Sequence, residues 1–162
     1  AHVDSQYGGQ GADSLATVII IEEVARVCAA SSLIPAVNKL GSLPLILAGT
    51  EEQKRKYLPQ LVAGKGFSYC LSESEAGSDA ASLRTKATKS GDKWIINGSK
   101  KWISNAEISD FYTVIAQTDP SLGSKGITAF VVEKSDAGVS FGAPEKKRDF
   151  VDRQLVKCIS IM

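Results

Sequence analysis

The first part of the chain consists of long apolar runs with short polar interruptions. From residue 15 to residue 30 apolar side chains occupy almost every position, and the three charged residues of this segment share one narrow stripe. This pattern predicts a helix, with Asp13 or Ser14 as its N-terminal cap. Because so thin a polar face leaves most of the helix surface apolar, we expect other helices to surround it.

Two more helices are expected before residue 66. The serine pair at 31–32 is predicted to end the first helix, and a second helix begins near residue 33 with Pro35 in its first turn. Gly41 and Pro44 are expected to disturb that helix. The segment 50–53, Thr-Glu-Glu-Gln, has the spacing of a capping box and predicts a third helix.

After residue 66 the apolar pattern changes to the alternation that is typical of strands. The predicted strands span residues 67–72, 82–90, 93–98, 111–118, 126–134 and 138–142. Gly91 and Asp92 are expected to join the second and third strands as a hairpin, and Asn97-Gly98 is typical of a further turn. Helices followed by an antiparallel sheet or barrel give the fold class α+β, with segregated parts.

Composition excludes several classes of function. The 162 residues carry a net charge of +1, so no basic field indicates a nucleic-acid or anionic-membrane partner. No apolar run approaches the roughly 18 residues of a membrane span. Cys28, Cys70 and Cys158 are far apart and are expected to be small buried residues, and a single histidine, His2, argues against a histidine metal site. No metal site is predicted, and without a signal-peptide pattern a cytoplasmic location is expected.

Three segments together resemble the acyl-CoA dehydrogenase family. They are "GTEEQKRKYLPQLVAGK" at 49–65, "YCLSESEAGSD" at 69–79, and "WIINGSKKWISNA" at 94–106, which "KGITAFVVEK" follows. Ser74 stands where many members have proline after the Ser-Glu pair. The resemblance covers roughly residues 5–147 and implies that 1–66 is the end of an N-terminal helical domain and 67–147 a β-domain that binds FAD. Residues 148–162 depart abruptly from the family and form a separate tail without an evident partner.

The resemblance also implies a set of site residues. The strand end and the small-residue loop after it would approach the flavin and its phosphates through backbone N–H groups and the Ser72 hydroxyl. Trp102 would pack on the isoalloxazine ring and the Ser104 hydroxyl would bond near N5, while Ser78 would also contact the CoA part of the substrate. The expected cofactor contacts are Tyr69, Cys70, Leu71, Ser72, Gly77, Ser78, Trp102, Ile103 and Ser104.

Each of these residues also has a plainer interpretation. Residues 75–79 alone would favour a surface turn capped by Asp79, and Trp102 alone would favour an ordinary core aromatic residue. Trp94 is interpreted as structural. The pair Lys100-Lys101 is expected to lie on a solvated face.

The function that the resemblance implies is α,β-dehydrogenation of acyl-CoA thioesters, with electrons passed to electron transfer flavoprotein. In most members the base is a glutamate of a C-terminal helical domain, which would lie beyond residue 162, and we nominate no carboxylate here in its place. The chain also starts without methionine, so residues are expected upstream. A fragment of such an enzyme is therefore expected, from the cytoplasm or, in a eukaryote, the mitochondrial matrix.

Other functions stay open at this point. The chain would otherwise be a non-catalytic flavin-binding or interaction fragment, an inactive remnant, or part of an acyl-CoA oxidase or a related flavin monooxygenase on the same fold. Full-length members form homotetramers, but the helices that build the tetramer core would be missing here. Acyl chain length is not legible from the sequence.

Overall fold

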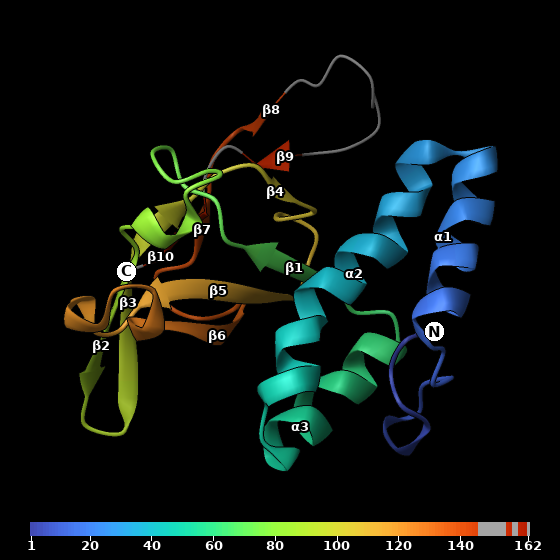
Figure 1. The fold of residues 1–162 in the computed structure, drawn as a ribbon, viewed down its shortest axis with the longest axis horizontal. Helices are drawn as coiled ribbons and strands as arrows, with labels where there is room; N and C mark the ends of the chain where they lie inside the picture. Colours follow the sequence, from blue (N-terminus) through green and yellow to red (C-terminus); the bar gives the residue numbers. More distant parts are fainter. Residues whose placement is uncertain (146–154, 157–158, 162) are drawn as a thin grey trace.

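A computed structural model describes residues 1–145, 155–156 and 159–161 of the chain. Three helices form one side of the molecule and the strands form the other (Figure 1). The helices are α1 (Ser14–Val27), α2 (Ala29–Ala48) and α3 (Glu51–Val62), after a short 3₁₀ turn at Ser5–Tyr7. The predicted caps are confirmed: Asp13 Oδ1 accepts from the Ala16 N–H at 2.8 Å, and Thr50 and Gln53 form the capping box.

The predicted break at 31–32 is wrong. The chain leaves the helical conformation at Cys28, which is extended, and α2 then runs without interruption through Pro35, Gly41 and Pro44. Ser32 is buried, and its hydroxyl donates to the Ala29 carbonyl at 2.7 Å. The hydroxyl therefore has its hydrogen-bond partner within the helix. Tertiary packing against α1 and β1 therefore decides the extent of α2, and the local breakers do not.

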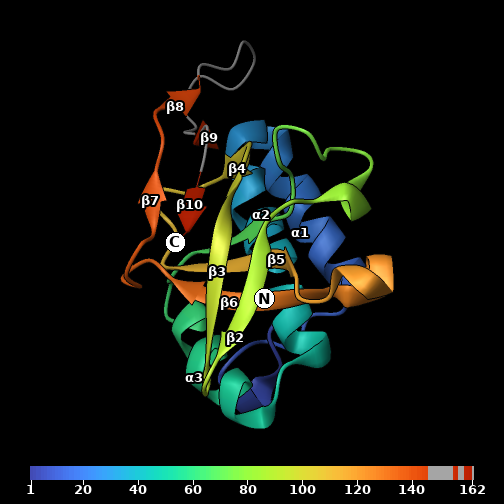
Figure 2. The same ribbon diagram turned by 90° about the vertical axis from the view of Figure 1, so that its left-hand side faces the viewer.

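The strands form two sheets in the part of the chain that the structure describes. They are β1 (Phe67–Cys70), β2 (Lys86–Ser90), β3 (Lys93–Lys100), β4 (Ile103–Ser104), β5 (Phe111–Gln117), β6 (Ile127–Glu133), β7 (Ser140–Phe141), β8 (Pro144–Glu145), β9 (Leu155–Val156) and β10 (Ile159–Ile161). The larger sheet has the order β1-β5-β2-β3-β10-β7, with β6 also on β5, and the smaller has the order β4-β9-β8 (Figures 1 and 2).

The larger sheet is mixed, not purely antiparallel. β1 pairs with β5 in parallel, in the register Phe67 with Phe111 through Cys70 with Val114, whereas β3 pairs antiparallel with β2 and β6 pairs antiparallel with β5. The hairpin turn at Gly91 is confirmed, with φ of +60°. The α+β class with segregated parts holds, but the parallel pair means that the chain crosses from β1 to β5 by way of the hairpin.

Asn97-Gly98 is not a turn, because both residues lie inside β3. A Cβ atom on Gly98 would stand 2.3 Å from Thr85 Oγ1 and 2.7 Å from Thr85 Cα. The glycine is therefore needed for the close approach of two backbones, which is the other common reason for glycine in a strand.

Two strands of the C-terminal tail have partners. β10 pairs with β3, Ile159 opposite Lys100, and also with β7, while β9 pairs with β4 and β8. The expectation that this tail lacks a partner is wrong for these strands. Residues 146–154, 157–158 and 162 lie outside the described residues, and so does the predicted burial of Cys158.

A shared core joins the helices to the sheet. Phe67 of β1 and Phe111 of β5 are buried together with Tyr57 and Leu58 of α3. Hydrogen bonds reinforce this junction, since the Phe67 N–H donates to Asn38 Oδ1 at 2.7 Å and Thr113 Oγ1 donates to the Gly41 carbonyl at 2.6 Å. The start of β1 and the neighbouring part of β5 are thereby fixed against α2.

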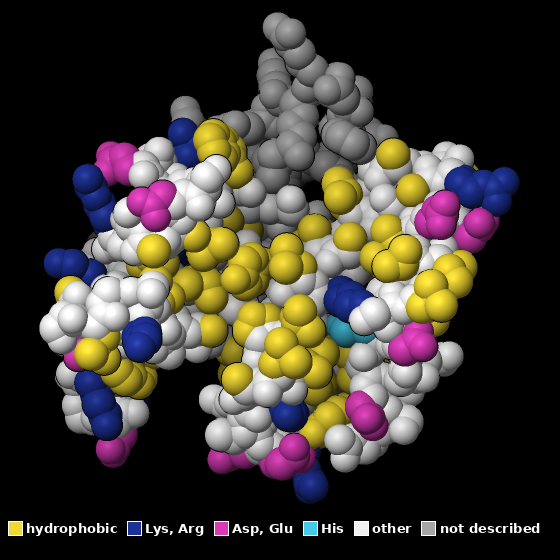
Figure 3. All heavy atoms as spheres, viewed as in Figure 1, with side chains coloured by type: hydrophobic (Ala, Val, Ile, Leu, Met, Phe, Trp, Pro, Cys, Tyr) yellow, Lys and Arg dark blue, Asp and Glu magenta, His cyan; other side chains and the backbone are white. Residues whose placement is uncertain are grey.

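Much of the apolar surface of α1 and α2 is not covered by the described residues. Figure 3 shows hydrophobic side chains gathered over these helices, where the exposed ones include Leu15, Val18, Ile19, Val27, Ile34 and Leu47. Cys28 is exposed as well, against its predicted burial. By length and composition α2 is able to cross a membrane, contrary to the sequence expectation, although core helices of soluble proteins pass the same test.

Candidate functional site

A cavity of about 310 Å³ lies between α2, the end of β1 and the segment that contains β4. Its volume is at the small end of the range that ligand pockets occupy, about 300–1,000 Å³. The residues that line it are Val37, Leu40, Tyr69, Leu71, Ser72, Trp102, Ile103 and Ser104. Six of the nine predicted cofactor contacts, which come from two segments some thirty residues apart in sequence, therefore meet around one space.

Hydrogen bonds between the two segments close this side of the cavity. The Lys101 N–H donates to the Ser72 carbonyl at 2.8 Å, and the Ser68 hydroxyl donates to the Ser104 carbonyl at 2.7 Å. The Ser68 hydroxyl also bonds to that of Ser109 at 2.8 Å. The end of β1 and the residues around β4 are therefore one connected unit.

Two hydroxyl groups at the cavity are left without a partner in the described part of the chain. The Ser72 and Ser104 carbonyls accept the bonds just described, but neither hydroxyl donates to or accepts from another described residue. Both side chains are half-buried and line the cavity. Half-buried hydroxyls without partners next to apolar walls are a suitable donor set for a flat heteroaromatic ligand.

Trp102 has an unusual backbone conformation. Its φ is +59°, in the left-handed region that bulky side chains rarely adopt, and Asn105 follows with φ of +61°. The indole is 53% exposed, so the interpretation as an ordinary core aromatic residue is wrong. The Lys101 ammonium lies 5.0 Å from the centre of the indole ring. Trp102 thus lines the cavity with an aromatic ring that is about half exposed.

The other three predicted contacts do not line the cavity. Cys70 is fully buried in the sheet core with its side chain among Ile103, Tyr112 and Val114, and burial raises the pKa of its thiol. The Cys70 thiol is therefore not available to a ligand. Gly77 and Ser78 are exposed in the loop after β1, as the flavin and the surface-turn interpretations both require. Trp94 packs edge-on against Phe130, consistent with a structural role.

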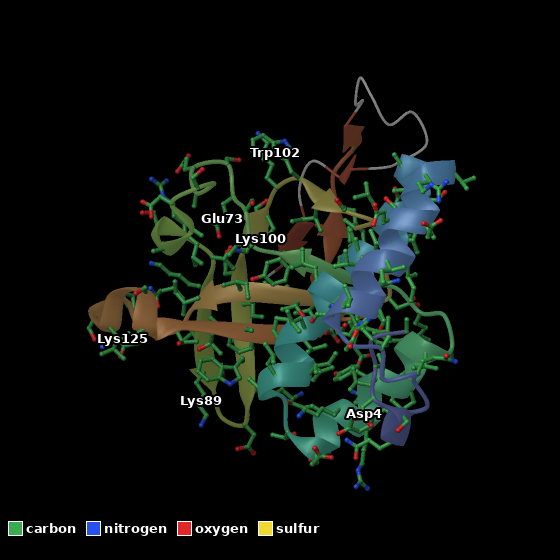
Figure 4. All side chains as sticks on the ribbon, turned by 45° about the vertical axis from the view of Figure 1, so that its right-hand side comes forward. Asp4, Glu73, Lys89, Lys100, Trp102 and Lys125 are labelled. Atoms are coloured by element: carbon green, nitrogen blue, oxygen red, sulfur yellow. The ribbon has the colours of Figure 1, made fainter. Side chains whose placement is uncertain are left out.

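Sequence reasoning missed one feature beside the cavity. Lys100, expected on a solvated face, is 1% exposed, and its Nζ lies 2.7 Å from Glu73 Oε1 (Figure 4). Burial alone raises the pKa of the Glu73 carboxyl, but hydrogen bonds from Lys100, Thr85 and the Arg84 N–H outweigh it and lower this pKa to about 2. Burial lowers the pKa of the Lys100 ammonium, and its bond to Glu73 opposes that effect. The Glu73 carboxyl is therefore ionised at neutral pH.

The chemistry of the site is that of a binding surface. No aspartate or glutamate is among the residues that line the cavity. Within the described ranges no group of three or more histidine, cysteine, aspartate or glutamate side chains is placed to hold a metal ion. The arrangement can pack a planar ring and donate hydrogen bonds to it.

Comparison with known proteins identifies the family of the chain. Residues 1–65 match the family model of the acyl-CoA dehydrogenase N-terminal domain, and residues 68–149 match that of the middle domain. A probable acyl-CoA dehydrogenase of Mycobacterium leprae is 61% identical over 147 residues, which are 90% of this chain and 38% of that protein. The mitochondrial short/branched chain specific acyl-CoA dehydrogenase of Bos taurus is 47% identical over 146 residues, 90% of this chain and 34% of that protein.

A solved structure shows the same fold. The acyl-CoA dehydrogenase of Bacillus anthracis, complexed with FAD, superposes with a TM-score of 0.90 at 35% identity, over 100% of this chain and 27% of that one. The chain thus spans little more than a third of the length of the curated relatives it matches. The two family models together cover most of its residues, and the chain belongs to the acyl-CoA dehydrogenase family of oxidoreductases, as a part that corresponds to the N-terminal and middle domains.

Proposed function

We propose that this chain is the flavin-binding part of an FAD-dependent acyl-CoA dehydrogenase. The whole enzyme would desaturate acyl-CoA thioesters between the α and β carbons and pass the electrons to electron transfer flavoprotein. The observation that carries the proposal is the cavity lined by Trp102 and by Ser72 and Ser104, whose hydroxyls have no partner among the described residues. Its relatives support FAD as the cofactor, since a family member with the same fold is known in complex with FAD.

The residues present fit a flavin. Bound FAD would supply the two-electron chemistry by accepting hydride from the substrate. The Trp102 indole offers a face for the ring, and the Ser72 and Ser104 hydroxyls can donate to its polar edge, where donors fixed in advance stabilise negative charge. Val37, Leu40 and Leu71 line the rest with apolar groups, which exclude water from the ring.

Proton abstraction is not assigned to this cavity. A general base has to reach the substrate within hydrogen-bond distance, and the lining includes no carboxylate. We therefore place the base in a part of the enzyme outside the described residues. The same observation favours the second candidate function, a flavin-binding fragment without catalysis of its own.

Partners and location follow from the family and are part of the proposal. We expect acyl-CoA and electron transfer flavoprotein as partners of the whole enzyme, and a homo-oligomer in full-length members. The relatives are bacterial and mitochondrial, so we propose the cytoplasm or the mitochondrial matrix. Nothing in the charge of +1 favours nucleic acid.

An anaerobic bleaching experiment tests whether the chain binds flavin and whether it carries a catalytic base. The purified chain is loaded with FAD, and acyl-CoAs of several chain lengths are added while the flavin absorbance is recorded. We expect a bound flavin band that acyl-CoA does not bleach, because no carboxylate lines the cavity. Bleaching of the flavin band by acyl-CoA would show that this chain itself contains the catalytic base. A chain that acquires no flavin band would contradict both candidates.

A further inference from the structure

A buried ion pair lies directly behind the cavity wall. Lys100 at the end of β3 is 1% exposed and Glu73, in the loop after β1, is 7% exposed. Taking two charges out of water is costly, and a well-packed apolar pair in their place is often as stable. A contribution to stability alone is therefore a weak explanation for this pair. The backbone groups to which the pair is hydrogen-bonded indicate its role better.

The pair fixes the loop that follows β1. Lys100 Nζ donates to the Leu71 carbonyl at 3.0 Å as well as to Glu73 Oε1 at 2.7 Å. Glu73 Oε1 also accepts from the Thr85 N–H at 3.0 Å and its hydroxyl at 2.6 Å, and Oε2 accepts from the Arg84 N–H at 2.6 Å. One carboxylate thus ties the loop to both β3 and the start of β2.

The pair also lies next to the backbone of the strained residue of the cavity wall, because Lys100 precedes Trp102 by only two positions. Trp102 follows Lys100 by two positions and has φ of +59°, a conformation that persists only where neighbouring contacts enforce it. Lys100 is buried in the core. The next residue, Lys101, donates its backbone N–H to the Ser72 carbonyl at 2.8 Å, so the backbone is held on the N-terminal side of Trp102. Figure 4 shows Glu73, Lys100 and Trp102 gathered at one end of the β-domain.

We propose that Lys100 and Glu73 are a positioning pair that holds Trp102 and Ser72 in the arrangement the cavity needs. Neither residue of the pair lines the cavity. The pair acts by fixing the Leu71 carbonyl and the backbone that leads into Trp102, and in that backbone the Lys101 N–H holds the Ser72 carbonyl. As far as the ligand is FAD, this inference rests on the proposed function. The ordering of Trp102 can be tested without FAD.

The test uses charge-removing variants of similar shape. Lys100→Met and Glu73→Gln each break the pair, and the double variant removes both charges. Glu75→Gln is the matched control, since Glu75 lies in the same loop and forms an ion pair with Arg84 that is exposed on both sides. All variants carry Trp94→Phe, so that Trp102 is the single tryptophan. If Lys100→Met does not fold, Glu73→Gln and the double variant still test the pair.

Two readouts distinguish positioning from mere stabilisation. The first is the near-ultraviolet circular dichroism band of Trp102 without FAD, recorded well below each variant's thermal midpoint. The second is the Kd for FAD from fluorescence quenching. We expect the pair variants to lose most of the Trp102 band and to bind FAD roughly tenfold more weakly, a difference equivalent to losing a charge-assisted hydrogen bond. Glu75→Gln should retain both.

The outcomes separate the inference from the proposed function. Pair variants that are folded and keep the Trp102 band overturn the inference, even if their thermal midpoints fall. If they lose the band while the parent chain binds no FAD, the positioning role stands and the proposed function fails. If the parent binds FAD and every pair variant binds it equally well, the function stands and the positioning role is overturned.

Discussion

Gly98→Ala is the substitution for which the structure predicts the sharpest effect. Gly98 lies inside β3 directly against Thr85, and an added Cβ would stand 2.3 Å from Thr85 Oγ1, 2.6 Å from its Cβ and 2.7 Å from its Cα. Real Cβ contacts do not occur at such distances, so the backbones of residues 85 and 98 have to separate. A rotation of the Thr85 side chain would not remove the clash, because the Thr85 Cα is itself too close to the added Cβ.

The cost can be estimated from two contributions. Overpacking a well-filled core costs about 1–3 kcal/mol. Separation also stretches the hydrogen bonds from Thr85 to the Glu73 carboxylate, and a bond to a charged group is worth about 1.5–3 kcal/mol. Replacing glycine by alanine in a strand recovers about 0.5–1 kcal/mol of backbone entropy. We therefore expect a net loss of about 3 kcal/mol, which in a chain of this size lowers the thermal midpoint by roughly 6–12 °C.

Thermal unfolding followed by far-ultraviolet circular dichroism measures this loss. Gly77→Ala is the control, since a Cβ there meets no atom within 4 Å, and it should leave the midpoint nearly unchanged or slightly higher. A Gly98→Ala variant as stable as the parent, or a Gly77→Ala variant destabilised to the same extent, would refute the close approach of the two strands.

Three further predictions concern the site and the tail. Ser72→Ala and Ser104→Ala should each raise the Kd for FAD roughly fivefold, the value of one neutral hydrogen bond, with little change in thermal midpoint. Because the pKa of Glu73 is about 2 when folded and 4.5 when unfolded, its stabilisation is complete above pH 4.5 and is lost as the pH falls from 4.5 toward 2. That loss reaches about 3 kcal/mol in acid unfolding by urea, and Glu73→Gln should remove this part of the pH dependence. Deleting residues 146–162 should lower the thermal midpoint, because it leaves the β3 edge at 98–100 unpaired.

The three predictions would be contradicted by the following results. Unchanged FAD affinity in both serine variants would show that the hydroxyls do not face the ring. An unaltered acid profile in Glu73→Gln, measured against Glu75→Gln, would show that the buried pair is not ionised. A truncated chain with the parent's midpoint would show that β10 adds nothing to the sheet.

Local signals predicted the starts of α1 and α3 and the hairpin correctly. Asp13 and Thr50 cap helices by hydrogen bonds to residues three positions away, and Gly91 forms a turn through its own dihedral angles. A few neighbouring residues are therefore enough to predict these features. The serine pair at 31–32 and Gly98 were misinterpreted for the opposite reason. What decides these positions is packing with other elements, that of α2 against α1 and β1 and that of β3 against Thr85, which the local sequence does not show.

The site was predicted in part, for the same physical reason. The segments around Ser72 and Trp102 could be named from the family resemblance, and the structure brings them to one cavity. Lys100 could not be found, since a lysine beside another lysine is usually solvated and its partner Glu73 lies 27 positions earlier. Trp102 could be named but not its left-handed backbone, because only the contacts around it make that conformation tolerable.

An FAD titration tests the central claim most directly. The flavin fluorescence is recorded while the parent chain, the Ser72→Ala/Ser104→Ala double variant and the Glu75→Gln control are added in turn. The account predicts saturable quenching at one FAD per chain for the parent and the control, and a Kd roughly twenty-five-fold higher for the double variant, the product of two neutral hydrogen bonds. Equal binding by all three proteins would place the flavin elsewhere, and no quenching by the folded parent would contradict a flavin site formed by residues 69–72 and 102–104.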